Sequence, residues 1–126
     1  MKEIINTDKA PAPIGPYNQA IKKGNSLFIS GQIALDAASG SMINDTIQNE
    51  TAKVLENLNA ILVEANFSKE DIVKCSIFIK DMNQFQEINT VYASYFEGTI
   101  APARETVEVV RLPKDVNVEI SAIAMK

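Results

Sequence analysis

Residues 102–124, near the end of the 126-residue chain, constrain the fold most because they contain two runs of β-forming residues around a turn. In the first run, alternation puts Val107 and Val109 on one face of a strand. The second run puts four apolar residues on one face: Val118, Ile120, Ala122 and Ala124. Pro113-Lys114-Asp115, between the runs, is typical of a tight turn. We therefore predict a hairpin whose register brings the two apolar sets onto one buried face.

The predicted register also gives this hairpin a polar face. It carries Arg104, Thr106 and Glu108 on one strand beside Asn117, Glu119 and Ser121 on the other. One interpretation is a solvated surface whose ion pair contributes ~0–1 kcal/mol. The other is an anion site, in which the Arg104 guanidinium binds a carboxylate through two parallel hydrogen bonds. A neighbouring carboxylate and hydroxyl would then orient water or move a proton. The pattern leaves both interpretations open.

Length and charge exclude several classes of protein. A chain of 126 residues with 46% apolar composition predicts a single folded domain over residues 1–126. The net charge of −4 and the lack of any Lys/Arg run argue against a nucleic-acid-binding protein. No apolar run approaches the ~20 residues of a membrane span, and the first residues contain no signal-peptide core. We therefore expect no membrane association and a cytoplasmic location.

Two residue types that are rare or absent narrow the chemistry. There is no histidine, so the commonest general acid or base and the commonest metal ligand are missing. Cys75 is the single cysteine, which excludes an intrachain disulfide and a cysteine-based zinc site. We interpret Cys75 as a small buried apolar residue rather than a nucleophile, because no base lies near it in the sequence.

The remaining pattern predicts the order β-β-(β)-α-β-α-β-β. Three prolines make residues 1–17 a stiff, irregular segment. The elements that follow are strands at 19–23, 26–33 and 42–43, a helix at 46–66, a strand at 72–80, a helix at 83–96 and the closing strand pair. Lys23-Gly24-Asn25 predicts a hairpin turn, Gly31 a bulge, and Asp45 with Gln48 a capping box at the start of the first helix.

Two long helices on one face of the sheet predict a two-layer α+β domain. The other face then carries Phe28, Phe78 and Val110 without a cover, which predicts a partner chain in a closed homo-oligomer. On the second helix, Asn89 lies on the apolar stripe between Phe85 and Tyr92. A polar side chain there either makes a structural hydrogen bond to the sheet or reaches the edge of a pocket.

Short motifs run through almost the whole chain in a fixed order. They are Pro13-Ile-Gly-Pro-Tyr-Asn-Gln-Ala20, Ile29-Ser-Gly-Gln32, Asn57-Leu-Asn-Ala-Ile-Leu62, Asp81-Met82, Asn89-x-x-Tyr92-x-x-Tyr95-Phe96, Pro102-Ala-Arg104, Leu112-Pro113, Val118-Glu-Ile120 and Ala122-Ile-Ala124. Each motif alone is weak, whereas their joint order and spacing are specific. By these motifs the chain resembles the reactive intermediate deaminase (RidA) family, also called the YjgF family.

This resemblance implies a chorismate-mutase-like fold and a homotrimer with a barrel-like centre and a site in each cleft between subunits. It implies hydrolysis of short-lived enamines and imines, such as 2-aminoacrylate, 2-iminopropanoate and 2-iminobutanoate, to 2-oxo acids and ammonia. These compounds are released by pyridoxal-phosphate-dependent dehydratases acting on serine or threonine. The resemblance implies no cofactor and no metal.

The family's site residues match positions of this chain. Its substrate-binding arginine corresponds to Arg104, its glutamate to Glu119 and its early tyrosine to Tyr17. The resemblance further implies substrate contacts from four positions: Ser30, Gly31, Asn89 and Thr106. Thr106 departs from the family pattern, in which this position is often cysteine. If the ligand contacts only the backbone at that position, the difference is harmless.

The expected mechanism follows from these residues. Arg104 holds the carboxylate of a 2-imino acid, and a water positioned by Glu119 attacks the carbon of the C=N bond, while Tyr17 closes the pocket. Two other functions stay open at this point. One is a non-catalytic regulator that binds small 2-oxo or 2-amino acids in the same pocket. The other is an endoribonuclease, which the absence of histidine and the acidic charge disfavour.

Overall fold

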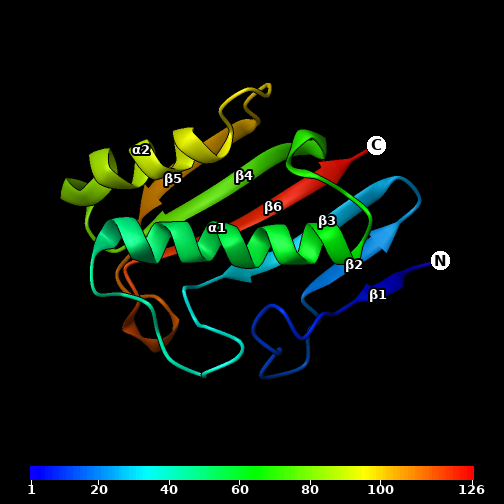
Figure 1. The fold of residues 1–126 in the computed structure, drawn as a ribbon, viewed down its shortest axis with the longest axis horizontal. Helices are drawn as coiled ribbons and strands as arrows, with labels where there is room; N and C mark the ends of the chain where they lie inside the picture. Colours follow the sequence, from blue (N-terminus) through cyan, green and yellow to red (C-terminus); the bar gives the residue numbers. More distant parts are fainter.

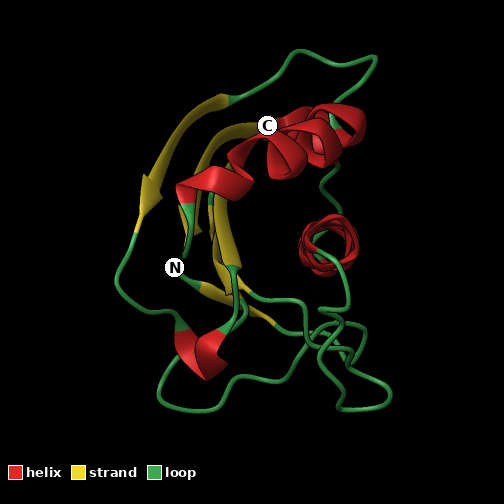
Figure 2. Ribbon diagram, turned by 90° about the vertical axis from the view of Figure 1, so that its left-hand side faces the viewer, coloured by secondary structure: helices red, strands yellow, loops and turns green.

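The computed structural model describes all residues from Met1 to Lys126 as a two-layer α+β domain. Six strands form one sheet: β1 (Glu3–Ile5), β2 (Ala20–Lys23), β3 (Ser26–Gln32), β4 (Ile72–Ile79), β5 (Ala103–Glu108) and β6 (Val118–Met125). Two long helices, α1 (Ile47–Glu64) and α2 (Phe85–Tyr95), lie on the same side of this sheet (Figures 1 and 2). The predicted two-layer architecture is therefore confirmed.

The strand order is β1-β2-β3-β6-β4-β5, and every neighbouring pair is antiparallel except β4 and β5, which are parallel. β2 and β3 form the predicted hairpin, with Gly24 in the left-handed region that its turn requires (φ 58°). The predicted bulge at Gly31 is also present, between Ile29 and Gln32. Two predictions are wrong: Glu3–Ile5 forms a strand, and the expected strand at 42–43 is a single bridge between Leu35 and Met42.

The predicted closing hairpin does not form. β5 pairs with β4 rather than with β6, and β6 enters the middle of the sheet between β3 and β4. A central strand needs partners on both edges, and the inward residues of β6, including Val118 and Ile120, are completely buried. β5 is an edge strand, and the side chain of Val107 is 40% exposed there, so Val107 belongs to no buried face.

This pairing separates the residues that the hairpin register had put on one polar face. Arg104 lies beside Cys75 and Thr106 beside Ile77, so both are on the helix-covered face of the sheet. Glu119 lies beside Phe78, one position out of phase with Ile77, and is therefore on the opposite, open face. The expectation that Arg104, Thr106 and Glu119 share a face of one chain is wrong, because β5 and β6 each pair with β4 in a register that puts Glu119 out of phase with the other two.

Helix α1 begins one residue later than the capping box predicted. The N-cap is Thr46, whose hydroxyl accepts a hydrogen bond from the backbone N–H of Asn49 at 3.0 Å, while Asp45 accepts only from the Asn49 side chain. One face of α1 packs on the sheet. On that face the completely buried carboxylate of Glu50 accepts hydrogen bonds from the backbone and side-chain nitrogens of Asn117, both at 2.8 Å. These bonds join α1 to the start of β6.

The second face of the sheet has no covering layer in this chain (Figure 2). Phe28 is 48% exposed on it, and Val110, beyond the end of β5, is 94% exposed. Neither helix is long and apolar enough to cross a membrane.

Candidate active site

Arg104 lies under helix α2, where three side chains hold its guanidinium. Its Nη1 donates a hydrogen bond to Asn89 Oδ1 at 2.8 Å. Its Cζ atom is 4.8 Å from the centre of the Tyr92 ring and 5.6 Å from the centre of the Phe85 ring. Both aromatic contacts are within the range of cation–π attraction. Arg104 is thus a fixed cation and not a mobile surface side chain.

The sequence explains this arrangement through two periodicities. Phe85, Asn89 and Tyr92 are spaced four and three residues apart, so they share one face of α2. Arg104 faces them because alternation along β5 turns it toward the helix layer. Part of the apolar stripe that the pattern predicted on α2 therefore forms the surface that contacts Arg104. For Asn89, the structure shows a hydrogen bond to the arginine that was predicted to bind the substrate.

Two buried hydroxyls near Arg104 lack a hydrogen-bond partner within the chain, those of Tyr92 and Thr106. Burial raises the pKa of Tyr92 well above its usual range, so this hydroxyl keeps its proton. Burial also raises the pKa of the Cys75 thiol, which lies beside Arg104 in the β4–β5 register. Cys75 is completely buried, which agrees with its interpretation as an apolar residue.

A second group of predicted residues surrounds a separate cavity of about 120 Å³. Tyr17, Gly31 and Glu119 all line it, together with Ile14 from the proline-containing segment and Lys114 from the loop before β6. Burial raises the pKa of the Glu119 carboxyl above its ordinary value, because desolvation disfavours the charged form. A carboxyl whose pKa is raised in this way holds a proton more readily than an exposed one and is suited to a general acid–base role.

Gly31 makes room for Glu119 in this cavity. A Cβ atom at Gly31 would be 2.8 Å from Glu119 Cδ and 2.9 Å from Glu119 Oε2, closer than non-bonded atoms come. The bulge in β3 therefore places the backbone of Gly31, which has no side chain, against the Glu119 side chain.

Ser30 lies outside both groups. Its hydroxyl donates a hydrogen bond to the carbonyl of Asn18 at 2.7 Å. It lines a different hollow of about 350 Å³ on the open face of the sheet, with Ser76 and Ser121 among the neighbours. Within one chain, the structure thus assembles Arg104, Asn89 and Thr106 in one cluster and Tyr17, Gly31 and Glu119 in another, on opposite faces of the sheet.

Sequence reasoning missed several residues around these clusters. Phe85 and Tyr92 had been predicted as apolar packing residues, although their spacing around Asn89 marks them as neighbours of any group that Asn89 binds. Gln19 and Lys114 also line the Glu119 cavity. No signal in the pattern pointed to Lys114, because its position depends on the loop between β5 and β6. No group of three or more His, Cys, Asp or Glu side chains is placed to hold a metal ion.

Comparisons with known proteins place this chain in a family. The family model described as "Endoribonuclease L-PSP" matches residues 7–126. The crystal structure of the YjgF gene product of Escherichia coli superimposes with a TM-score of 0.94 at 40% identity, covering 98% of each chain. The chain belongs to the RidA/YjgF family. The resemblance stated from the sequence motifs is thereby confirmed.

Other RidA/YjgF relatives are similar over their full length. A RutC family protein of Pyrococcus horikoshii is 55% identical over 126 residues, which is 100% of this chain and 99% of the relative. A mouse protein named 2-iminobutanoate/2-iminopropanoate deaminase is 40% identical, covering 100% of this chain and 93% of its own. The structure of Escherichia coli TdcF with bound serine has a TM-score of 0.95 at 43% identity, with 98% of each chain covered.

Proposed function

We propose that this protein is a hydrolytic deaminase that converts short 2-imino acids and their enamine tautomers, such as 2-iminopropanoate, 2-aminoacrylate and 2-iminobutanoate, to 2-oxo acids and ammonia. The observation that carries the proposal is the fixed guanidinium of Arg104, held by Asn89 and two aromatic rings. The name of the mouse relative and the serine bound to TdcF support a small amino-acid-like ligand.

Arg104 binds the substrate carboxylate. Its Nη1 already donates to Asn89, which leaves the other N–H groups of the planar fork to bind the carboxylate. The buried Thr106 hydroxyl, which has no partner within the chain, is a further donor or acceptor for a bound water. The carboxylate, common to all substrates of this class, sets the orientation of the C=N bond.

Glu119 acts as the general base and general acid. The substrate reacts as its protonated iminium form. Glu119 accepts one proton from a water whose oxygen bonds to the iminium carbon, and the resulting carbinolamine carries the new hydroxyl and a neutral amino group. Glu119 returns that proton to nitrogen and then takes the hydroxyl proton as the C–N bond breaks and the carbonyl forms; the released ammonia carries this last proton away as ammonium. The raised pKa of Glu119 suits this exchange, and Tyr17 covers the cavity. Imines react readily with water, so orientation with modest acid–base help suffices, and no cofactor or metal is needed.

The complete site requires two copies of the chain. Arg104 and Glu119 are on opposite faces of the sheet within one chain, so one substrate molecule cannot touch both. We propose that the Glu119 cavity of one copy meets the Arg104 cluster of the next in a closed homo-oligomer, a trimer as the family resemblance implies. The exposed apolar side chains of Phe28 and Val107 on the open face support burial against another copy.

The test couples this protein to a pyridoxal-phosphate-dependent serine or threonine dehydratase, whose proposed partner role is to release the imine, and follows 2-oxo acid formation. We expect Arg104→Ala to lose at least ~30-fold in kcat/KM, because truncating one member of a buried charge pair costs about 2–5 kcal/mol. Arg111→Ala is the matched control, since Arg111 is exposed and pairs only with Asp115. Equal activity of wild type and Arg104→Ala would contradict the proposal.

Two other functions are separated by the same reagents. Binding of 2-oxobutanoate without any acceleration of imine hydrolysis would indicate a non-catalytic regulator, an alternative that the serine-bound relative favours. Cleavage of RNA that is lost in Arg104→Ala would indicate an endoribonuclease, as the family model is named. The net charge of −4 disfavours the RNA substrate.

A further inference from the structure

Gln19 directly precedes β2, and its buried side chain makes hydrogen bonds to the N-terminal segment. Only 2% of the residue is exposed. Its Oε1 accepts a hydrogen bond from the backbone N–H of Thr7 at 2.6 Å. Its Nε2 lies 3.0, 3.1 and 2.8 Å from the carbonyl oxygens of Thr7, Ala10 and Pro11 and donates to them. One side-chain amide therefore makes hydrogen bonds to the backbone of Thr7, Ala10 and Pro11.

The segment that Gln19 holds forms a wall of the Glu119 cavity. Four of its residues line that cavity: Pro11, Ala12, Ile14 and Tyr17. Pro11, Pro13 and Pro16 have no N–H, so this stretch has few donors with which to tie itself to neighbouring strands. Its position depends instead on donors supplied by other residues. Gln19 is a buried donor that reaches the carbonyl of Pro11, the first residue of this stretch, and the carbonyls of Thr7 and Ala10 just before it.

The backbone of Gln19 is tied to the floor of the same cavity. Its carbonyl accepts a hydrogen bond from the backbone N–H of Ser30 at 2.9 Å. Ser30 directly precedes Gly31, against which the Glu119 carboxyl packs. The backbone N–H of Gln19 donates to Asn6 Oδ1 at 2.9 Å. A single residue thus connects the proline-containing wall to the β3 bulge against which the Glu119 carboxyl packs.

We propose that Gln19 is a positioning residue for the deamination proposed above, on which this inference rests: it fixes the wall formed by residues 11–17 over Glu119 and thereby keeps bulk water away from the carboxyl. A dry carboxyl interacts more strongly with a substrate proton than a solvated one. The wall also carries Tyr17, so its displacement would open the cover of the site.

Gln19→Met tests the proposal, because methionine has a similar length but satisfies none of the three carbonyls. Three quantities are measured: hydrogen exchange in residues 6–18, the titration of Glu119 by NMR with ¹³C-labelled glutamate, and the kinetics of imine hydrolysis. We expect faster exchange in residues 6–18 but not in α1, and titration of Glu119 closer to its ordinary value. We expect kcat to fall on the order of 10- to 100-fold.

Asn18→Ala is the matched control. Asn18 is the neighbouring residue, and its side chain makes only an exposed hydrogen bond with Asn6 at 3.1 Å. This variant should leave all three measurements close to wild type. Should Gln19→Met not fold, Gln19→Glu takes its place, because it keeps the acceptor for Thr7 N–H and removes the donor.

The outcomes separate this inference from the proposed function. A folded Gln19 variant with unchanged exchange in residues 6–18 would overturn the positioning role. So would faster exchange with no change in the Glu119 titration. If the wild-type protein does not hydrolyse imines, the proposed function fails, and the reaction assigned to this wall fails with it. Exchange and titration would then report only whether Gln19 organises the cavity.

Discussion

The Glu119 carboxyl packs against Gly31 so closely that a side chain at position 31 must displace it. In Gly31→Ala the added Cβ would be 2.8 Å from Glu119 Cδ. We expect the carboxyl to move and kcat for imine hydrolysis to fall about 10- to 100-fold. Overpacking of this kind also costs about 1–3 kcal/mol of folding stability. Steady-state kinetics and urea unfolding measure the two effects.

Gly24→Ala is the control for this prediction. Gly24 is in a left-handed turn (φ 58°) with open space around its Cα, far along β3 from the bulge. Alanine there costs about 1–2 kcal/mol because of its Cβ, and turnover should stay at the wild-type level. Full activity of Gly31→Ala would show that Glu119 need not lie where the structure places it.

Individual residues were more predictable than their contacts. The sequence singled out Arg104 and Glu119 on the polar face of the predicted hairpin and Asn89 on the apolar stripe of the second helix, and the family motifs matched all three. The contact between Arg104 and the ring of Tyr92 could not be predicted, since it depends on which strand lies beneath α2. Alternation fixes the face of a side chain relative to its own strand, and only strand pairing fixes what that face meets.

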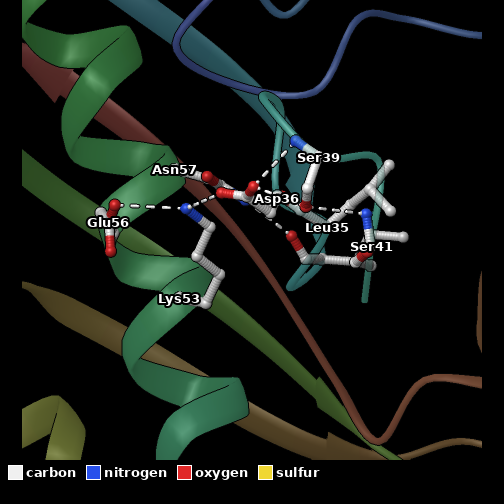
Figure 3. Close-up of polar contacts among 8 residues, drawn as sticks. Leu35, Asp36, Ser39, Ser41, Lys53, Glu56 and Asn57 are labelled. Carbon is white, nitrogen blue, oxygen red and sulfur yellow. Dashed lines mark hydrogen bonds and ion pairs between the residues drawn. The ribbon is translucent and has the colours of Figure 1, made fainter. Parts of the chain in front are cut away.

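The loop from Leu35 to Met42 is fastened to helix α1 by a cluster of charged and polar groups (Figure 3). Lys53 Nζ is 3.0 Å from Asp36 Oδ1 and 3.2 Å from Glu56 Oε1. Asp36 also accepts hydrogen bonds from the backbone N–H and the hydroxyl of Ser39, at 2.9 and 2.7 Å. The Ser39 hydroxyl, followed by Lys53, lowers the pKa of Asp36 to about 2.

This cluster predicts how stability depends on pH. The folded-state pKa of Asp36 is below its ordinary value of 3.8, so its stabilising effect is fully present above about pH 4 and is lost as the pH falls toward 2. We expect Asp36→Asn to have a lower free energy of unfolding than wild type at pH 7. The difference should shrink between pH 4 and pH 2, as measured by urea unfolding across that range.

Glu64→Gln is the control, since Glu64 is an exposed carboxylate on the same helix. It should change stability little at either pH. A constant difference between wild type and Asp36→Asn down to pH 2 would show that the loop is not held by the ionised carboxylate.

At the level of whole elements, the sequence did not predict which strands pair with β5 and β6. β5 and β6 follow each other in the chain with turn residues between them, and such strands commonly pair. Here the loop after β5 crosses β4, and β6 pairs with β3 and β4 instead of with β5. The composition of the two strands partly indicates which one is central and which one is at the edge. The inward face of β6 is wholly apolar and suits a central strand, whereas the inward face of β5 carries Arg104 and Thr106 and suits an edge.

The two-layer architecture and the uncovered face of the sheet follow from counting helices and apolar strand faces, so both were predictable for the molecule as a whole. The division of the candidate site into two clusters was not. The predicted hairpin had put Arg104 and Glu119 on one face of a single chain, and the observed pairing puts them on opposite faces. The observed pairing supports a site shared between copies, because neither face of one chain contains both groups.

A mixing experiment tests that argument directly. Arg104→Ala and Glu119→Ala chains, each expected to have little activity alone, are unfolded together in equal amounts and refolded. If each site takes Arg104 from one copy and Glu119 from its neighbour, about a quarter of the sites in random closed rings contain both wild-type residues. We therefore expect activity to return to roughly a quarter of the wild-type level. A mixture of Arg104→Ala with Asn89→Ala is the control, because these two residues bond within one chain and mixing cannot restore them together. Recovery in neither mixture would place the reacting groups within one chain, against the strand pairing that separates them.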